Sequence, residues 1–199
     1  MIAVVDYGAG NLFSVKNALD FLSLRSKVTR DAVEISAADG IILPGVGAFP
    51  DAMRMLEEAG LTGVLREEAG RKPFLGICLG MQMLFEEGLE FTKTSGLGLI
   101  PGSVERIKTD YKVPHMGYNE LEMNLPSPLL DGVETGSSVY FVHSYAAVTP
   151  SEYVAAYCDY GCKIPALVQR GMVFGAQFHP EKSGDTGLRI LKNFGRLTR

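Results

Sequence analysis

The sequence of 199 residues has no tryptophan, no long apolar run and no excess of positive charge. A formal net charge of −4 gives no reason to expect a nucleic acid or an anionic membrane as a partner. No apolar run approaches the roughly 18 residues that a membrane-spanning helix needs. The opening stretch, Met1 to Asp6, is too short and uncharged for a signal peptide. These absences predict a cytoplasmic protein.

Cysteine is also scarce, with three residues in the chain. An odd number of cysteines without a secretion signal argues against a disulfide framework and for a reducing compartment. Cys158 and Cys162 have three residues between them and no second pair, which is poor spacing for zinc. We therefore expect them to fill small core or turn positions, and we expect no metal site.

The third cysteine, Cys78, has a glycine two residues away on each side, Gly76 and Gly80. The apolar residues before it predict a buried strand, and Leu79 to Glu86 predict a helix. This pattern is the G-x-S-x-G nucleophile elbow with sulfur in place of oxygen. Backbone N–H groups at the start of a helix favour a thiolate and can receive an oxyanion. The alternative is an inert buried cysteine.

The first 90 residues alternate predicted strands with predicted helices, which favours a parallel sheet covered by helices on both faces. The first helix, expected from Leu12 to Leu24, follows Gly8 and Gly10. Candidates for its buried side are Phe13, Val15, Leu19, Phe21 and Leu22. The two glycines match a dinucleotide-binding turn only weakly, because Phe13 holds the third glycine position. We expect no cofactor.

Beyond Gly96, short strand candidates are separated by turn residues, and a helix from Ser183 to Arg196 closes the chain. We expect these strands to be antiparallel or edge strands that return to the same sheet. The prediction is one α/β domain over residues 1–199, with a flavodoxin-like, mostly parallel sheet and additional antiparallel strands in the C-terminal half.

A thiol nucleophile needs a base, and the base needs a group that orients it. His179 precedes Pro180, which favours an extended backbone, so Glu181 points to the same side as His179. The sequence therefore predicts a Cys78–His179–Glu181 triad. The plainer alternative is a turn at a strand end with a solvated glutamate. His143 competes for the role of base, but no acid follows it closely.

The attack of a thiolate on a carbonyl creates an oxyanion that needs hydrogen-bond donors. The backbone N–H of Leu79 supplies one donor. The segment of Gly45, Val46 and Gly47 is the candidate for a second, because glycine allows neighbouring peptide planes to turn over. We hypothesise that this segment rests with a carbonyl facing the site and switches to an N–H.

Three motifs in this sequence resemble those of the class I, triad-type glutamine amidotransferases. They are Pro44-Gly45-x-Gly47, Gly76-x-Cys78-x-Gly80-x-Gln82 and Phe178-His179-Pro180-Glu181. More narrowly, four segments are similar to the glutaminase subunits of imidazole glycerol phosphate synthases. They are Asp6 to Asn11, Pro44 to Phe49, Phe141 to Tyr145 and Gln177 to Ser183. The resemblance extends from Asp6 to the final helix.

The resemblance implies that Cys78 attacks the side-chain amide of glutamine, while His179 takes and returns a proton. Further contacts to glutamine are implied for Gly45, Gly47, Gln82, Glu90, Ser144 and Tyr145. The ammonia would pass to a separate cyclase subunit, which makes imidazole glycerol phosphate and a purine precursor in histidine biosynthesis. Many members of the class have two consecutive glycines in the oxyanion segment, whereas Val46 intervenes here.

Because the predicted triad and its sheet use all 199 residues, we expect the acceptor reaction to take place on a docked partner. Candidates for the docking face are Asn11, Tyr140, Lys182 and Lys192, each of which has the alternative of being an ordinary solvated residue. Rival functions are the glutaminase of another complex, such as pyridoxal phosphate synthase, and a stand-alone cysteine hydrolase. A flavodoxin-like binding module is the non-enzymatic alternative.

Overall fold

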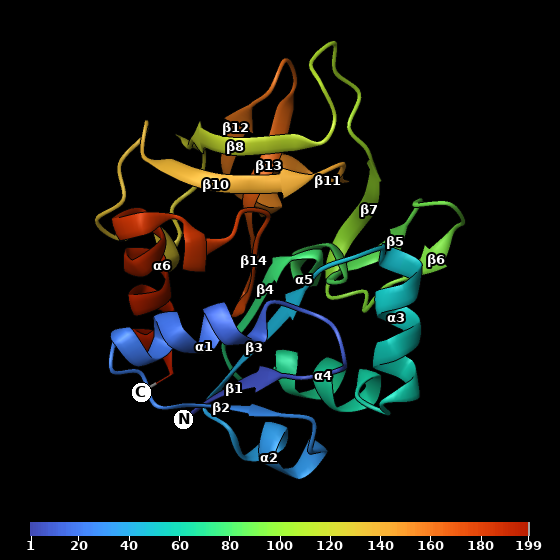
Figure 1. The fold of residues 1–199 in the computed structure, drawn as a ribbon, viewed down its shortest axis with the longest axis vertical. Coiled ribbons are helices and arrows are strands. Elements are labelled where there is room, and N and C mark those ends of the chain that lie inside the picture. The colour runs from blue at the N-terminus through green and yellow to red at the C-terminus, as the bar shows by residue number, and fades with distance from the viewer. Residues whose placement is uncertain (199) are drawn as a thin grey trace.

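The computed structural model describes residues 1–198, and an eight-stranded sheet forms its centre (Figure 1). Across the sheet the strands lie in the order β2 (Ser26–Thr29), β1 (Ile2–Val5), β3 (Gly40–Gly45), β4 (Phe74–Cys78), β14 (Val173–Ala176), β13 (Lys163–Arg170), β12 (Val154–Asp159) and β9 (Glu122–Met123). The pairs from β2 to β14 are parallel, and the pairs from β14 to β9 are antiparallel. This arrangement confirms the predicted fold class.

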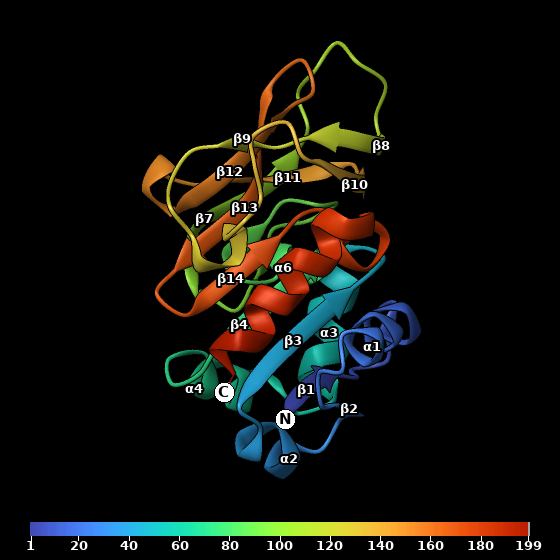
Figure 2. The ribbon, with the colours of Figure 1, turned by 90° about the vertical axis from the view of Figure 1, so that its left-hand side faces the viewer.

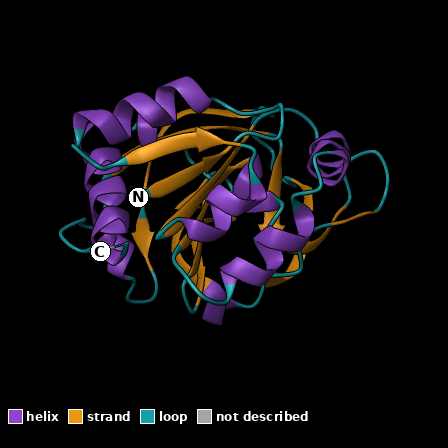
Figure 3. Ribbon diagram, turned by 90° about the horizontal axis from the view of Figure 1, so that it is seen from below, coloured by secondary structure: helices purple, strands orange, loops and turns teal. Residues whose placement is uncertain are grey.

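Helices cover both faces of the sheet, as Figure 3 shows. One face carries α1 (Leu12–Phe21) and α6 (Gly184–Leu197), and the other carries α2 (Ala32–Ala37), α3 (Phe49–Glu58) and α4 (Thr62–Ala69). Alternate residues of β1 show the division, since Val4 packs with α1 and Val5 packs with α2 and α3. A strand buried on both faces needs apolar side chains throughout, which explains its continuous apolar run.

The remaining strands form two small sheets at the end of the molecule opposite the two termini (Figure 2). One pairs β10 (Ser138–His143) with β8 (His115–Glu120), and the other has the order β11 (Tyr145–Val148), β7 (Ile100–Arg106), β5 (Phe85–Gly88) and β6 (Thr94–Ser95). Three short 3₁₀ helices, η1 (Pro128–Leu130), η2 (Ser151–Tyr153) and η3 (Pro180–Lys182), complete the chain. The expectation that the late strands return to the main sheet is therefore wrong for β7, β8 and β10, and β11 was not predicted.

Two predicted helices are shorter than expected. The helix after Cys78, α5 (Leu79–Gln82), gives way to β5 instead of continuing to Glu86. All residues from 78 to 85 are buried, so no polar face distinguishes a helix from a buried strand there. Helix α1 ends at Phe21, and the side chains of Phe13 and Phe21 are 77% and 76% exposed rather than buried. Its inner face is built from Val15, Ala18 and Leu19, which follow the spacing of three and four residues.

No helix within residues 1–198 is long and apolar enough to cross a membrane.

Candidate active site

Cys78 lies at a sharp turn between β4 and α5, with φ +56° and ψ −113°. A positive φ is unusual for a residue with a side chain and stores strain. A Cβ atom on Gly76 would lie 2.5 Å from the carbonyl oxygen of Gly80, and one on Gly80 would overlap the carbonyl oxygen of Leu43. Only glycine fits either position, so the predicted elbow is confirmed. Because α5 has four residues, its dipole contributes little to the thiol.

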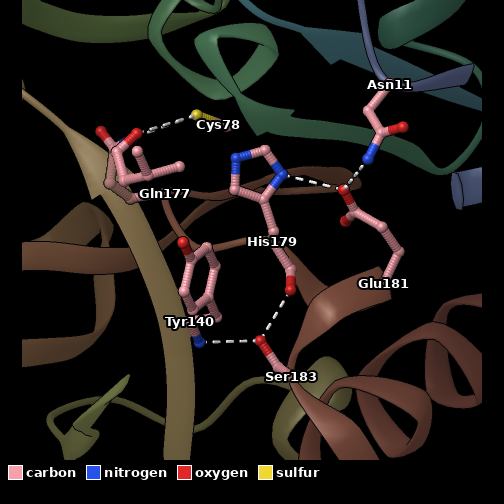
Figure 4. Close-up of polar contacts among 8 residues, drawn as sticks. Asn11, Cys78, Tyr140, Gln177, His179, Glu181 and Ser183 are labelled. Atoms are coloured by element: carbon pink, nitrogen blue, oxygen red, sulfur yellow. Dashed lines mark hydrogen bonds and ion pairs between the residues drawn. The ribbon is translucent and has the colours of Figure 1, made fainter. Parts of the chain in front are cut away.

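His179 follows β14, which lies beside β4 in the parallel part of the sheet. Its Nδ1 atom is 2.8 Å from Oε1 of Glu181, and the two side chains are 3% and 0% exposed. The imidazole lies between Cys78 and Glu181, with its other ring nitrogen facing the sulfur (Figure 4). The backbone N–H of His179 donates to the carbonyl of Tyr140, and the hydroxyl of Ser183 donates to the carbonyl of His179. The three predicted triad residues are therefore together, with His179 held by Tyr140 of β10 and by Ser183, which follows η3.

The surroundings of His179 favour its protonated form. Burial lowers its pKa, but the hydrogen bonds to Cys78 and Glu181, together with their charges, outweigh burial and raise the pKa to about 9. The second carboxylate oxygen of Glu181 is buried and has no hydrogen-bond partner among residues 1–198. A buried carboxylate with one free oxygen attracts an imidazolium strongly, and an imidazolium in turn stabilises a nearby thiolate.

A cavity of about 450 Å³ opens beside the sulfur of Cys78, within the size range of small-molecule sites. Its walls include most of the predicted oxyanion and glutamine-binding residues: Val46, Gly47, Leu79, Gln82, Glu90, Ser144 and Tyr145. The exception is Gly45, which is buried behind the wall, opposite Cys78 in the pairing of β3 with β4. The sequence did not indicate Pro114 or Val142, which also line the cavity.

The oxyanion segment borders this cavity. Val46 is 46% exposed, and Gly47 has φ +103° with nothing within 4 Å of its would-be Cβ. The space around Gly47 is therefore open, and its backbone conformation is the feature that requires glycine. The switch of a peptide plane at this segment stays a hypothesis.

Two residues predicted to contact glutamine, Glu90 and Gln82, also form hydrogen bonds with other segments around the cavity. The carboxylate of Glu90 accepts a hydrogen bond of 2.7 Å from the backbone N–H of Phe49 at the start of α3. The side-chain nitrogen of Gln82 donates to the carbonyl of Tyr145 at 2.9 Å and to Oε1 of Gln177 at 3.0 Å. Both side chains are thus fixed before any ligand binds.

Gln177 is a site residue that the sequence analysis missed. Its side chain is fully buried, and its Nε2 atom is 4.0 Å from the sulfur of Cys78. Gln177 and His179, which are two residues apart in the sequence, both approach the sulfur of Cys78. That spacing was the available signal.

The predicted docking residues lie in different surroundings. The half-buried Asn11 donates to Oε1 of Glu181 at 3.4 Å, so it contacts the triad directly. The ammonium group of Lys182 lies 5.9 Å from the ring centre of Tyr140, which packs edge-on against the exposed Tyr118. Lys192 is exposed more than two turns into α6. The contact of these four residues with a partner subunit stays a prediction.

The other two cysteines lie in the hairpin of β12 and β13 and are not bonded to each other. Cys158 is buried, and burial raises the pKa of its thiol to about 12. Such a thiol is chemically inert at neutral pH. Cys162 is half-buried, and burial also raises the pKa of its thiol.

Comparison with known proteins adds to this geometry. Residues 3–197 match the family model described as "Glutamine amidotransferase class-I". A curated protein of Bacillus cereus (strain G9842), "Imidazole glycerol phosphate synthase subunit HisH", is 55% identical over 195 residues, which cover 98% of this chain and 93% of that protein. A protein of the same description from Bacillus anthracis (strain A0248) is 54% identical with the same coverage. The chain belongs to the HisH family of class I glutamine amidotransferases.

Solved structures agree with this family assignment at the level of the fold. A structure described as "Crystal structure of glutamine amidotransferase" superimposes with a TM-score of 0.79 and 23% identity, over 100% of this chain and 99% of that chain. The "Structure of PurLQS from Thermotoga maritima" gives a TM-score of 0.72 and 20% identity, over 97% and 96% of the two chains. Membership in the HisH family makes the chain a glutamine amidotransferase, an enzyme, rather than a binding module.

Proposed function

We propose that this chain is the glutaminase of an imidazole glycerol phosphate synthase, and that Cys78, His179 and Glu181 carry out its reaction. The observation that carries the proposal is the buried contact of 2.8 Å between His179 and Glu181, with the imidazole directed at the sulfur beside the cavity. The identity of 55% to curated HisH subunits supports the choice of pathway, histidine biosynthesis.

In this proposal, the thiolate of Cys78 adds to the side-chain amide carbon of glutamine. The oxyanion that forms accepts hydrogen bonds from the N–H of Leu79 and from the segment of Val46 and Gly47. Imidazolium His179, whose pKa is raised to about 9, gives its proton to the departing ammonia. Water then attacks the thioester, and His179 serves as the base that removes the proton of this water. Glutamate and ammonia are the products.

The remaining wall residues bind the amino-acid end of glutamine. Glu90 carries a negative charge suited to the substrate ammonium group, and it lines the cavity. The turn at Ser144 and Tyr145, between β10 and β11, closes the same wall and offers backbone groups. Gln82 is held by two hydrogen bonds at the back of the cavity.

The ammonia is passed to a separate cyclase subunit docked over the cavity, since free ammonia would be protonated in bulk water. The exposed Tyr118 and Lys182 and the half-buried Tyr140 form a cluster near the triad and are the core of the proposed docking face. Asn11 lies beside this cluster, and Lys192 lies farther along α6. A cytoplasmic location belongs to the same proposal and is supported by three cysteines with free thiols.

The test is the variant Cys78→Ala, assayed together with the cyclase subunit and its substrate. We expect glutamine-dependent glutamate release to disappear while added ammonium still supports the cyclase reaction. The matched control is Cys162→Ala, which removes a thiol outside the site and retains both activities. Glutamate release by Cys78→Ala at the wild-type rate would refute the proposed nucleophile. Full glutaminase turnover that never responds to the cyclase subunit would favour a stand-alone hydrolase.

A further inference from the structure

A pair of buried histidines, which the proposed reaction does not use, begins at the cavity wall with His143 and continues behind it with His115. Nδ1 of His115 lies 3.1 Å from Nε2 of His143, and the two residues are 2% and 6% exposed. The ring of His115 is stacked between Phe141 and Tyr160, with centroid distances of 4.6 and 4.0 Å. Both rings are therefore held in place.

The positions of the protons follow from the partners of these rings. Nδ1 of His143 is 2.8 Å from the carbonyl oxygen of Tyr145, and a carbonyl only accepts, so this nitrogen carries a proton. Burial lowers the pKa of His143 to about 3, so the ring is neutral and its Nε2 atom accepts from His115. Burial lowers the pKa of His115 to about 4, so its Nε2 atom in turn accepts from Asn119 at 3.4 Å. All three hydrogen bonds run in one direction.

The carbonyl of Tyr145 also orients two side-chain amides. It accepts from Gln82, which must therefore present its nitrogen, and the second N–H of that nitrogen donates to Oε1 of Gln177. The amide of Gln177 consequently directs its own nitrogen toward the sulfur of Cys78, at 4.0 Å. We call the side chains of Gln82 and Gln177 the amide relay. The sulfur also lies 3.9 Å from the carbonyl oxygen of Val142.

We propose that His115 and His143 are positioning residues of the glutaminase site. Both are neutral Nδ1–H tautomers: His115 donates to His143, and His143 donates to the carbonyl of Tyr145. This carbonyl orients the amide relay so that an N–H group faces the sulfur of Cys78. A donor beside sulfur favours the thiolate, whereas a reversed amide would place an oxygen there and favour the thiol. The inference rests on the proposed function, because it assigns these residues to the same nucleophile. His115 acts at a distance, since it does not line the cavity.

A direct test is the tautomeric state of the histidines, read from ¹⁵N-correlated NMR spectra of the intact protein. The chain has three histidines, so each signal can be assigned with one substitution apiece. At pH 7 we expect neutral Nδ1–H rings for His115 and His143 and a doubly protonated ring for His179. A proton on Nε2 of His143 would overturn the proposal, because the Tyr145 carbonyl would then lack its donor.

The functional test uses His115→Phe, which preserves the aromatic stack but removes the N–H directed at His143. We expect the KM for glutamine to rise by about fivefold, the effect of one buried hydrogen bond. We also expect alkylation of Cys78 by iodoacetamide at pH 7, followed by peptide mass spectrometry, to slow by a similar factor. The matched control is Tyr160→Phe, which keeps its ring on the same stack and loses only the hydrogen bond to the carbonyl of Lys112. The control should stay within about twofold of the wild type.

A second pair of variants separates the donor from the volume of the side chain. His143→Asn keeps an N–H near the position of Nδ1, whereas His143→Leu fills the space without one. Alkylation of Cys78 should be closer to the wild-type rate in the asparagine variant. Equal rates of Cys78 alkylation in wild type, His115→Phe and His143→Leu would refute the positioning role and leave the proposed function standing. Glutamine hydrolysis by Cys78→Ala would instead defeat the proposed function, so the two failures are distinguishable.

Discussion

Nδ1 of His179 lies 2.8 Å from Oε1 of Glu181, and a single proline separates the two residues in the sequence. The backbone of His179 is extended, with φ −97° and ψ 96°, as expected for a residue before proline. The proposed base and the residue proposed to orient it thus form one local unit. Only the nucleophile has to be brought in from another strand.

This unit predicts the effect of Glu181→Gln. The amide keeps the shape of the side chain but removes the charge that stabilises the imidazolium, so kcat for glutamine hydrolysis should fall by about 10²–10⁴-fold with a smaller change in KM. Steady-state measurement of glutamate release tests this. Glu152→Gln, at an exposed position of η2, is the control and should behave as wild type. An unchanged kcat in Glu181→Gln would remove Glu181 from the triad.

The protonation of His179 should depend on Cys78. The hydrogen bond and the charge of Cys78 both raise the pKa of His179, which reaches about 9 in the intact site. Cys78→Ala removes both contributions while burial still lowers the pKa, so the midpoint of the His179 NMR titration should move to a clearly lower pH. The titration of His179 in Cys162→Ala should match that of the wild type. A midpoint for His179 that is the same in Cys78→Ala and wild type would show that the sulfur and the imidazole are not in contact.

Acid stability should depend on the buried histidines. Burial lowers the pKa of His115 and His143 to about 4 and 3, below the value of about 6.5 in the unfolded chain. Between pH 6.5 and 4 the unfolded state therefore binds more protons, and stability falls as the pH falls. At pH 5 the loss is about 2 kcal/mol for each histidine. Urea midpoints at pH 7 and pH 5 measure it, and His115→Phe should show the smaller difference. An equal change in the urea midpoint between pH 7 and pH 5 in the wild type and in His115→Phe would contradict the lowered pKa of His115.

Substitution by alanine should have opposite effects on stability at two glycines, Gly80 in the elbow and Gly63 in helix α4. Gly80→Ala places a methyl group against the carbonyl of Leu43, so we expect a loss of about 3 kcal/mol in unfolding free energy and of most glutaminase activity. Gly63→Ala, in helix α4 with nothing within 4 Å, should raise stability by up to about 1 kcal/mol and leave activity unchanged. Thermal melts and glutamate release on both variants test the pair. Equal stability in the two variants would show that the turn at Cys78 has room to relax.

The proposed docking face can be tested at Lys182. Its side chain is exposed beside the ring of Tyr140, so Lys182→Ala should weaken binding of the cyclase subunit by about fivefold and leave the unstimulated glutaminase rate unchanged. Lys27→Ala, in the edge strand β2, is a control with the same loss of charge. Calorimetry with the purified subunits gives both affinities. Wild-type affinity in Lys182→Ala would place the docking face elsewhere.

The sequence was most informative where one physical requirement determines one residue. Two glycines flanking a cysteine predicted the elbow, and a histidine before Pro-Glu predicted the base with its orienting acid. The fully apolar segment Ile2 to Val5 predicted a strand buried on both faces. For the turn and the strand the local pattern is sufficient, because sterics or burial leave few alternatives, whereas His-Pro-Glu indicates a base only together with Cys78.

Local sequence patterns are less informative where tertiary contacts determine the structure. The segment from Met83 to Phe85 could be helix or strand, and its backbone bonds to Leu97 and Leu99 commit it to leave the helix. Phe13 and Phe21 were expected in the core by composition, yet their spacing places them on the outer side of α1. The only signal for Gln177 was its spacing of two residues from His179, because its partners Gln82 and Cys78 are about a hundred residues away.

The place of β14 in the sheet has a consequence for synthesis of the protein in the cell. Strand β4, which carries Cys78, lies between β3 and β14, and β14 follows β4 in the chain only after strands β5 to β13. A nascent or prematurely terminated chain therefore exposes a bare apolar edge at its centre, a natural target for chaperones and proteases. The same order leaves Cys78 without His179, its proposed base, in any chain that stops before β14.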